Sequence, residues 1–189
     1  MSLILTSPPA TEPVSLAEAK AHLRITHTDD DTYISTLIIA ARRLVEARTG
    51  LRLLQQGWSL FLDTWPCGGM IDVPLAPLIA IDDIIIYGDL DTPATLDHAH
   101  YFLDAASRPP RVVFREGRVP AQPGRQANGI EVKLQAGFGA AATAVPQELK
   151  QAVLLITAHW FSRRGEGDDG VLPMAILELL APYRTKRLT

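Results

Sequence analysis

The sequence predicts an α+β protein in which a small antiparallel β lobe is inserted into a helical module. Two observations lead to this class. Apolar residues recur with a helical period toward both ends of the chain, and short segments rich in β-branched residues, separated by proline and glycine, fill the middle. With 189 residues and 47% hydrophobic side chains, we expect a single domain over 1–189. Its helical parts should cover about 13–52 and 144–189, and the β-rich insertion about 55–140.

Two helices are expected in the N-terminal part. Ser15 and Glu18 form a capping box that can bind the free amides at a helix start, and this helix should reach about Leu23. The second helix should begin in the acidic run 28–32 and end at Gly50, which suits a left-handed cap. Its C-terminal half carries basic residues that form either a solvated face or an interface with an acidic partner. These residues are Arg42, Arg43, Arg48 and Arg52.

Short strands with turn residues between them are expected in the middle of the chain. The segment 71–78 contains Pro74 and Pro77, so it belongs at a sheet edge, because proline lacks the N–H that a central strand needs. Gly137 and Gly139 should form a tight turn after the last strand, since neither a P-loop lysine nor a dinucleotide fingerprint accompanies them. The expected strands are 58–62, 79–87, 101–104, 111–114 and 129–136.

A long helix from Pro146 to about Arg164 is expected to be the centre of the fold. Proline suits the first helical position, and Glu148 lies at the positive end of the helix dipole. Apolar residues form one stripe and also occupy other sides, so the helix needs contacts with the rest of this chain, with other copies, or with both. The stripe contains Leu149, Ala152, Val153, Ile156 and Trp160, and the other sides carry Leu154, Leu155, Ala158 and Phe161.

The residues that could perform chemistry match no strong motif. His98 and His100 lack a recognised metal-binding spacing and indicate a surface turn, and His159 inside the apolar helix indicates a structural histidine. Cys67 is the single cysteine, has no CxxC partner and fits a reducing cytoplasm. The net charge of -3 argues against a chain that coats nucleic acid. We therefore expect no catalytic residue, no metal site and no cofactor.

Over nearly the whole chain, the order of several short motifs resembles that of the tailed-phage head-tail connector (adaptor) family. Each motif is weak alone, so the resemblance rests on their order and spacing. Phe138 and Phe161 depart from it mildly, because tyrosine is more usual at these positions. The motifs are 13–20, 29–31 before a helix that ends in Thr49-Gly50, Trp58 with Trp65-Pro66, 73–78, 101–104, 137–139 before Val145-Pro146, 159–161 and 179–184.

The resemblance implies a structural protein and no enzyme. Members form a ring, commonly of twelve subunits, beneath the portal protein of a DNA-filled head, and carry the tail or stopper. DNA passes through the channel without sequence-specific binding, and no membrane is involved. The expected location is the neck of a phage, prophage or gene transfer agent particle, reached from the host cytoplasm. Two alternatives stay open: a nucleic-acid-binding module that uses Arg42, Arg43 and Arg48, and an enzyme with a pocket near one of the histidines.

Three sets of residues are expected to serve the connector role. A helix after Pro173, behind the glycine-rich segment 165–170, would dock on the portal, and a chain truncated after Gly170 should still fold; the alternative is that this helix folds back onto its own core. A channel that lets DNA pass should carry acidic or neutral groups. The portal-docking candidates are Met174, Leu177, Leu180, Tyr183, Arg184, Lys186 and Arg187; the subunit-interface candidates are Arg42, Arg43, Leu154, Leu155 and Phe161; the lumen candidates are Asp29, Asp30, Asp31, Asp82 and Asp83.

Overall fold

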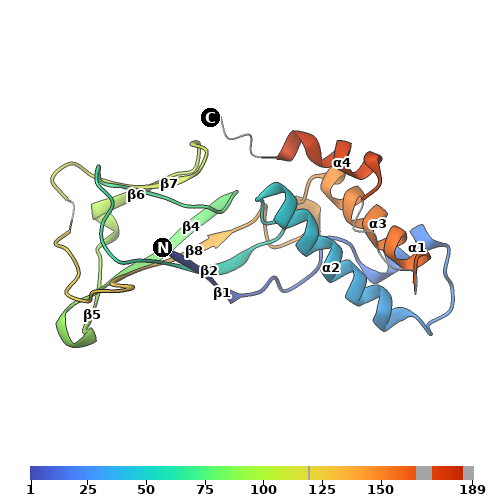
Figure 1. The fold of residues 1–189 in the computed structure, drawn as a ribbon, viewed down its shortest axis with the longest axis horizontal. Coiled ribbons are helices and arrows are strands. Elements are labelled where there is room, and N and C mark those ends of the chain that lie inside the picture. Colours follow the sequence, from blue (N-terminus) through green and yellow to red (C-terminus); the bar gives the residue numbers. More distant parts are fainter. Residues whose placement is uncertain (119, 165–171, 185–189) are drawn as a thin grey trace. The chain divides into compact units, whose positions relative to one another are not determined.

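The computed structural model describes every residue except 119, 165–171 and 185–189. Its chain divides into two compact units. Helices and antiparallel sheets occur together, so the mixed α+β class predicted from the sequence is confirmed (Figure 1). We call the units the β unit (Met1–Pro9 and Gln55–Phe138) and the helical unit (Ala10–Leu54 and Gly139–Thr189).

The β unit contains two antiparallel sheets. The strand order is β1-β2-β8-β4-β5 in the larger sheet and β3-β7-β6 in the smaller one, so β8 is a central strand between β2 and β4. The larger sheet consists of β1 (Ser2–Ser7), β2 (Gln56–Leu62), β4 (Leu78–Tyr87), β5 (Pro93–Thr95) and β8 (Ile130–Ala136), and the smaller one of β3 (Met70–Asp72), β6 (Tyr101–Asp104) and β7 (Arg111–Phe114).

The two sheets share one hydrophobic core. The register places Leu60, Val132 and Ile84 side by side on β2, β8 and β4, and all three are fully buried. Side chains alternate between the faces of a strand, so one face of the larger sheet supplies this core. Phe114 of β7 joins the same cluster and packs edge-on against Trp65, with ring centroids 5.0 Å apart.

Local sequence signals explain where the N-terminal helices begin and end. The Ser15 hydroxyl accepts a hydrogen bond from the Glu18 amide at 3.1 Å, and the Ser15 amide donates to the Glu18 carboxylate at 2.7 Å, so the predicted capping box is confirmed. Gly50 has the left-handed backbone (φ 76°) that ends the second helix. The α-helices of the described chain are α1 (Leu16–Leu23), α2 (Asp31–Thr49), α3 (Gln147–Ser162) and α4 (Met174–Leu180).

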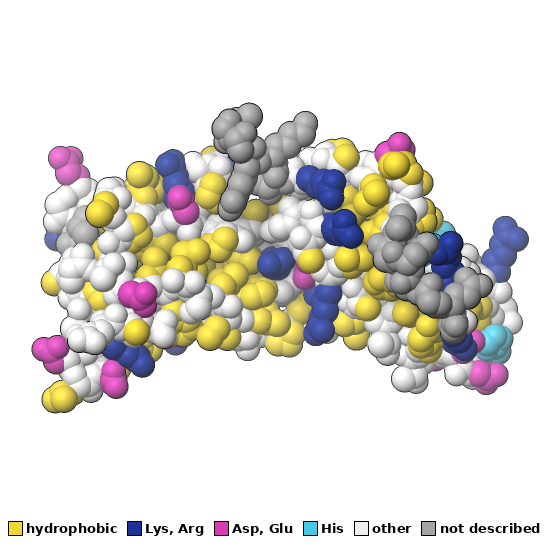
Figure 2. Space-filling view, viewed as in Figure 1, with side chains coloured by type: hydrophobic (Ala, Val, Ile, Leu, Met, Phe, Trp, Pro, Cys, Tyr) yellow, Lys and Arg dark blue, Asp and Glu magenta, His cyan; other side chains and the backbone are white. Residues whose placement is uncertain are grey.

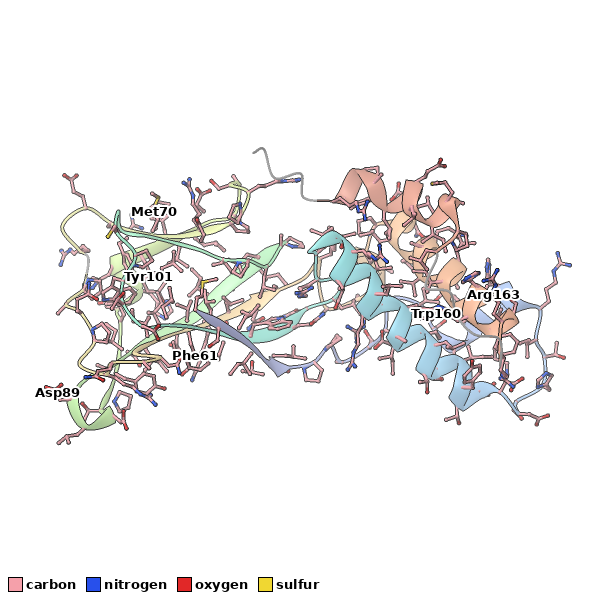
Figure 3. The ribbon with its side chains drawn as sticks, in the orientation of Figure 1. Phe61, Met70, Asp89, Tyr101, Trp160 and Arg163 are labelled. Atoms are coloured by element: carbon pink, nitrogen blue, oxygen red, sulfur yellow. The ribbon has the colours of Figure 1, made fainter. Side chains whose placement is uncertain are left out.

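Helix α3 lies at the centre of the helical unit and contacts α1, α2 and α4. Leu149, Val153 and Ile156 are fully buried, whereas Trp160 near the C-terminal end is half-buried (Figure 3). Pro146 precedes the helix as its N-cap and does not occupy the first helical position, a shift of one residue from the sequence expectation. Contacts on several sides therefore occur already within one chain.

Two strands have no counterpart in the sequence expectation. Strand β1 is exposed along almost its whole length. Its sequence therefore does not show the alternation of apolar and polar residues that marks a half-buried strand. Strand β5 has three residues and begins with Pro93. Short 3-10 helices complete the described elements: η1 (Asp89–Asp91), η2 (His98–His100), η3 (Ala142–Ala144) and η4 (Ala181–Tyr183). Within the described residues, no helix is both long and apolar enough to cross a membrane.

Candidate functional site

The candidate metal ligands do not come together in the described part of the chain, where no group of three or more His, Cys, Asp or Glu residues could hold a metal ion. His98 lies in η2 with an exposed ring, and its Nδ1 is 2.9 Å from the hydroxyl of Tyr101. Burial raises the pKa of Tyr101. Cys67 is exposed and forms no disulfide. The segment around His98 therefore has the geometry of the surface turn expected from the sequence.

The predicted basic stripe on α2 is wrong at Arg42. Its side chain is buried, with 5% of the residue exposed. Nε donates to Glu12 at 2.7 Å and Nη1 donates to Glu46 at 3.1 Å. The helical period explains the burial, because Ile38 and Val45 on the same face are core residues. The guanidinium of Arg42 is therefore occupied by contacts within its own unit and is not part of a solvent-facing stripe.

The other arginines of the stripe lie in different surroundings. Arg43 and Arg48 are exposed, whereas Arg52 is half-buried and donates from Nη1 to the carbonyl oxygen of Leu51 at 3.0 Å. Burial lowers the pKa of Arg52. The four arginines thus do not form one continuous solvent-facing stripe, and of the two interface candidates on α2 only Arg43 is accessible.

The acidic run at the start of α2 is largely paired within the helical unit. Asp31 binds the ammonium group of Lys20 at 2.6 Å, and Asp30 binds the guanidinium group of Arg164 at 2.7 Å. Asp30 is the N-cap residue of α2, but its side chain makes no capping hydrogen bond. The carboxylate of Asp29 remains largely exposed to solvent. Of these three lumen candidates, Asp29 offers its charge most openly.

Arg164 connects the end of α3 to the start of α2. Its guanidinium carbon lies 4.2 Å from the ring centre of Tyr33 and 5.1 Å from that of Phe161, both within range of a cation–π interaction. The hydrogen bond to Asp30 raises the pKa of Arg164. Phe161, an interface candidate, is therefore engaged inside its own unit. Leu154 and Leu155 are half-buried on α3 and keep some accessible surface.

The two lumen candidates of the β unit lie on β4. Asp82 accepts a hydrogen bond from the side-chain amide of Gln135 at 2.9 Å. Asp83 is partly exposed, with one carboxylate oxygen 3.9 Å from Nε2 of His98. The pairing of β4 with β8 shifts register between Ile81 and Asp83. A shift of this kind bends a strand locally and changes where the next side chains point.

The β unit contains a buried carboxylate that was not predicted from the sequence. Glu131 of β8 accepts hydrogen bonds from the Ser59 hydroxyl at 2.7 Å and from the Tyr87 hydroxyl at 2.9 Å. The second bond raises the pKa of Tyr87. Because β8 is central, these contacts join β2, β8 and β4 on the face opposite the apolar core. A charged residue inside a predicted central strand is the sequence signal that could have found it.

Helix α4 folds onto its own unit and contacts α3 and α2. Leu180, named as a portal-docking candidate, is 1% exposed and belongs to the core, together with Ile176 and Leu172. Ile176 and Leu180 are four residues apart, so they lie on the same, buried face of α4. Met174 lies on another face and is 69% exposed. Truncation after Gly170 would remove three core residues, and the expectation that the shortened chain stays intact is corrected accordingly.

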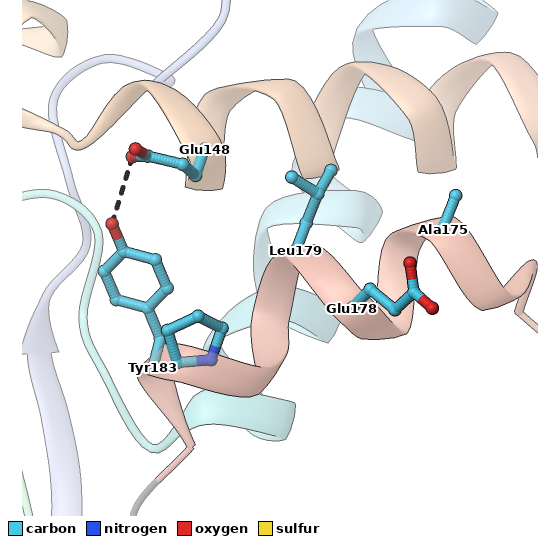
Figure 4. A pocket seen from close by; sticks show the side chains of 6 residues that line it. Glu148, Ala175, Glu178, Leu179 and Tyr183 are labelled. Atoms are coloured by element: carbon cyan, nitrogen blue, oxygen red, sulfur yellow. Dashed lines mark hydrogen bonds between the residues drawn. The ribbon is translucent and has the colours of Figure 1, made fainter.

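A groove of about 560 Å³ lies where α4 and η4 pass the start of α3 (Figure 4). Tyr183 donates a hydrogen bond to the Glu148 carboxylate at 3.0 Å, and the pKa of Tyr183 is raised by burial and by this bond. The expected docking residue Tyr183 is therefore held by its own unit, whereas Arg184 is exposed. Lys186 and Arg187 lie outside the described residues.

Exposed large hydrophobic side chains are concentrated on the β unit, and Figure 2 shows hydrophobic side chains gathered on its visible face. In the described chain, the helical unit contributes Ile39 and Met174 to this set. Large exposed apolar groups mark surfaces that bind other molecules when they cluster. Those of the β unit are Met1, Ile4, Leu5, Met70, Ile79, Leu90 and Phe102.

The chain is similar to a family of head-tail connectors and to proteins of gene transfer agent particles. Residues 13–88 match the family described as phage gp6-like head-tail connector protein. A protein in the neck of an empty gene transfer agent (GTA) particle, computed with C6 symmetry, is 27% identical with a TM-score of 0.85. One in the neck of a native GTA particle, computed with C12 symmetry, is 27% identical with a TM-score of 0.81.

Both alignments cover 100% of this chain and 98% of the matched chain. The virion of a native GTA particle contains a chain of the same fold, with a TM-score of 0.84 and 24% identity over the same shares of the two chains. No curated protein matches the sequence. The resemblance seen in the sequence is confirmed by the family match over residues 13–88 and by the likeness to the neck structures over the whole chain: the protein is similar to phage gp6-like head-tail connectors.

Proposed function

We propose that this chain is a structural head-tail connector that forms a ring, of twelve subunits in the particle, beneath the portal and joins the DNA-filled head to the tail or stopper. The observation that carries this proposal is the likeness to neck proteins over 100% of the chain, including both units. The C12 and C6 symmetry of those necks supports a homo-oligomeric ring, because cyclic symmetry places identical copies around one axis.

A structural role without catalysis fits the family and the matching structures, which are components of phage or phage-like necks. The nucleic-acid-binding alternative loses its main support at Arg42, because that guanidinium is held by Glu12 and Glu46. A connector also has to let DNA move through its channel, and additional phosphate contacts would hold the DNA in a salt-dependent manner. We therefore favour a lumen lined by acidic or neutral groups, with Asp29, Asp82 and Asp83 as its candidates.

The portal-docking surface in this proposal is the outward side of α4 and the segment after it. Met174 and Arg184 are exposed there, and Leu177 is half-buried. Leu180 supports the surface from inside, because it anchors α4 to the helical unit. Methionine adapts well to a partner's surface, and an arginine can pair with a carboxylate. For the contact between subunits, Arg43, Leu154 and Leu155 remain the accessible candidates on the helical unit.

The docking surface can be tested without removing the core residues of α4. A strain that makes particles, and lacks its own copy of the gene, would receive the chain with Met174→Glu and Arg184→Glu. We expect a folded protein, because both changes leave the buried Ile176 and Leu180 in place. We also expect DNA-filled heads without tails, because one change replaces an exposed apolar side chain by a charge and the other reverses an exposed charge. Leu90→Glu is the matched control, since Leu90 is 98% exposed in the β unit and should support normal particles. Normal numbers of tailed particles from the double variant would refute docking by this surface.

A further inference from the structure

We propose that the outer edge of β1 pairs, backbone to backbone, with a second copy of this chain. This inference rests on the proposed ring and assigns one of the contacts that hold it together. In the described structure, β1 has one strand neighbour, β2, and its other side forms the border of the larger sheet (Figure 1). Such a border carries N–H and C=O groups that have no strand partner, and these can bind another strand.

The sequence of β1 lacks the features that protect a sheet edge. Its six residues, Ser-Leu-Ile-Leu-Thr-Ser, include no charged residue, no proline and no glycine. Proteins usually guard an exposed edge with a lysine, a proline, a bulge or a very short strand, because a bare edge recruits other chains. The one irregularity in β1 is a register shift between Leu5 and Ser7, at the end of the strand. Most of the edge is therefore regular and available for pairing.

The other border strands of the described sheets are protected. Strand β5 has three residues and begins with proline, and β3 has three residues and ends in Asp72. Strand β6 has four residues and ends in Asp104, whose carboxylate binds Arg111 at 2.7 Å. All three are shorter than β1, and each contains a proline or a carboxylate. The difference points to a specific partner for β1, since a bare edge in a folded protein is otherwise an aggregation site.

The side chains of β1 support the same conclusion. Ile4 is 54% exposed and Leu5 is 41% exposed. Consecutive residues of a strand point to opposite faces, so apolar surface is available on both faces of the sheet at this border. Leu3, on the same face as Leu5, packs partly against the core of the β unit. A strand added next to β1 would cover Ile4 on one face and Leu5 on the other while it completes the backbone hydrogen bonds.

The chemistry of the edge favours a second copy over a different protein. An uncharged strand offers no electrostatic selection for an acidic or basic partner, so its occupant is decided by proximity and geometry. In a ring with cyclic symmetry, an identical neighbour stands beside every subunit, and the related necks have C6 or C12 symmetry. A ring contact joins two different surfaces of neighbouring copies, so β1 of one copy meets another segment of the next. Six residues at about 3.3 Å each give a contact of roughly 20 Å.

Site-specific photocrosslinking in assembled particles can test this pairing. The chain would carry Leu5→p-benzoylphenylalanine, and the matched control Leu90→p-benzoylphenylalanine, in a strain without its own copy of the gene. Both positions are exposed leucines, so neither change disturbs the core. After irradiation we expect a covalent product of twice the chain mass from position 5 and little from position 90. A product that contains a different neck protein, or none that contains a second copy, would overturn the inference.

A second variant tests whether the edge contributes to assembly. Leu5→Lys places a charge on the edge of β1, and Leu90→Lys adds the same charge elsewhere on the β unit. We expect at least tenfold less incorporation of Leu5→Lys into particles, with a circular dichroism spectrum like that of the wild type, and normal incorporation of Leu90→Lys. Equal incorporation of both variants would contradict the inference. Wild-type chain absent from particle necks would instead contradict the proposed function.

Discussion

The helical unit and the β unit differ in which of their side chains and backbone groups remain accessible to a partner. In the helical unit, Arg42 pairs with Glu12 and Glu46, and Asp30 pairs with Arg164. Most of the large exposed apolar side chains of the described chain lie in the β unit, and the outer edge of β1 has no strand neighbour among the described residues. Groups that are already paired within one chain cannot supply contacts to another without losing those partners. Assembly contacts should therefore come from the outer edge of β1 and from the outward side of α4.

The strongest test of internal pairing in the helical unit is Arg42→Ala. Removing the guanidinium takes a buried ion-pair partner from Glu46, which also interacts electrostatically with Arg52, so we expect a loss of up to about 3–5 kcal/mol in the free energy of unfolding. Arg43→Ala, one residue away on the exposed side of α2, should change it by about 0.5 kcal/mol or less. Urea denaturation followed by circular dichroism measures both. Similar losses for the two variants would contradict the contrast between the two arginines.

The attachment of α4 predicts the next largest effect. Leu180→Ala creates a cavity under the helix and should lower the free energy of unfolding by about 2–5 kcal/mol. Met174→Ala removes an exposed side chain and should cost about 0.5 kcal/mol or less. The same denaturation experiment separates the two outcomes. If both variants were as stable as the wild type, α4 would not be part of the core of the helical unit in solution.

The capping box at α1 predicts a smaller change. Ser15→Ala removes the hydroxyl that accepts from the Glu18 amide and should cost about 1 kcal/mol. Ser15→Thr keeps an acceptor at this position and should recover most of that stability. Thermal unfolding of the three proteins provides the comparison. A threonine variant as unstable as the alanine variant would show that the hydroxyl is not the stabilising group.

The smallest expected effect is a pH dependence in the β unit. The Ser107 hydroxyl and the Arg111 guanidinium bind the Asp104 carboxylate and lower its pKa to about 2. A lowered pKa stabilises the fold at pH values above the unfolded pKa of about 3.9, and the contribution is lost as the pH falls toward 2. Asp104→Asn should therefore show a shallower loss of stability between pH 4 and pH 2 than the wild type. Parallel pH profiles for the two proteins would exclude this contribution.

Signals that lie close together in the sequence predicted much of the fold. Ser15 and Glu18 marked the start of α1, Gly50 marked the end of α2, and short apolar segments between turn residues marked β2 and β8. The physical causes of these elements act over a few residues, so they can be recognised without the tertiary structure. Strand β1 could not be found in this way, because its border position leaves nearly every residue exposed and removes the alternation.

The candidate site was harder to predict, because its residues depend on distant partners. The burial of Arg42 requires Glu12, thirty residues earlier, and the pairing of Asp30 requires Arg164 near the end of α3. The spacing of Met174, Leu177 and Leu180 in the sequence indicates one shared helix face. In the structure, however, Leu180 is buried together with Ile176. Which face of a short amphipathic helix is buried depends on its tertiary contacts, and the repeat alone does not determine it.

The most direct test of the central claim is a reconstruction, by electron cryo-microscopy, of the neck of particles assembled with this chain. The connector role predicts a closed ring of twelve copies between the portal and the tail, with both units ordered in the ring. The same map would show whether β1 lies beside a neighbouring copy. A neck without this chain, or particles that form complete tails when its gene is deleted, would contradict the account.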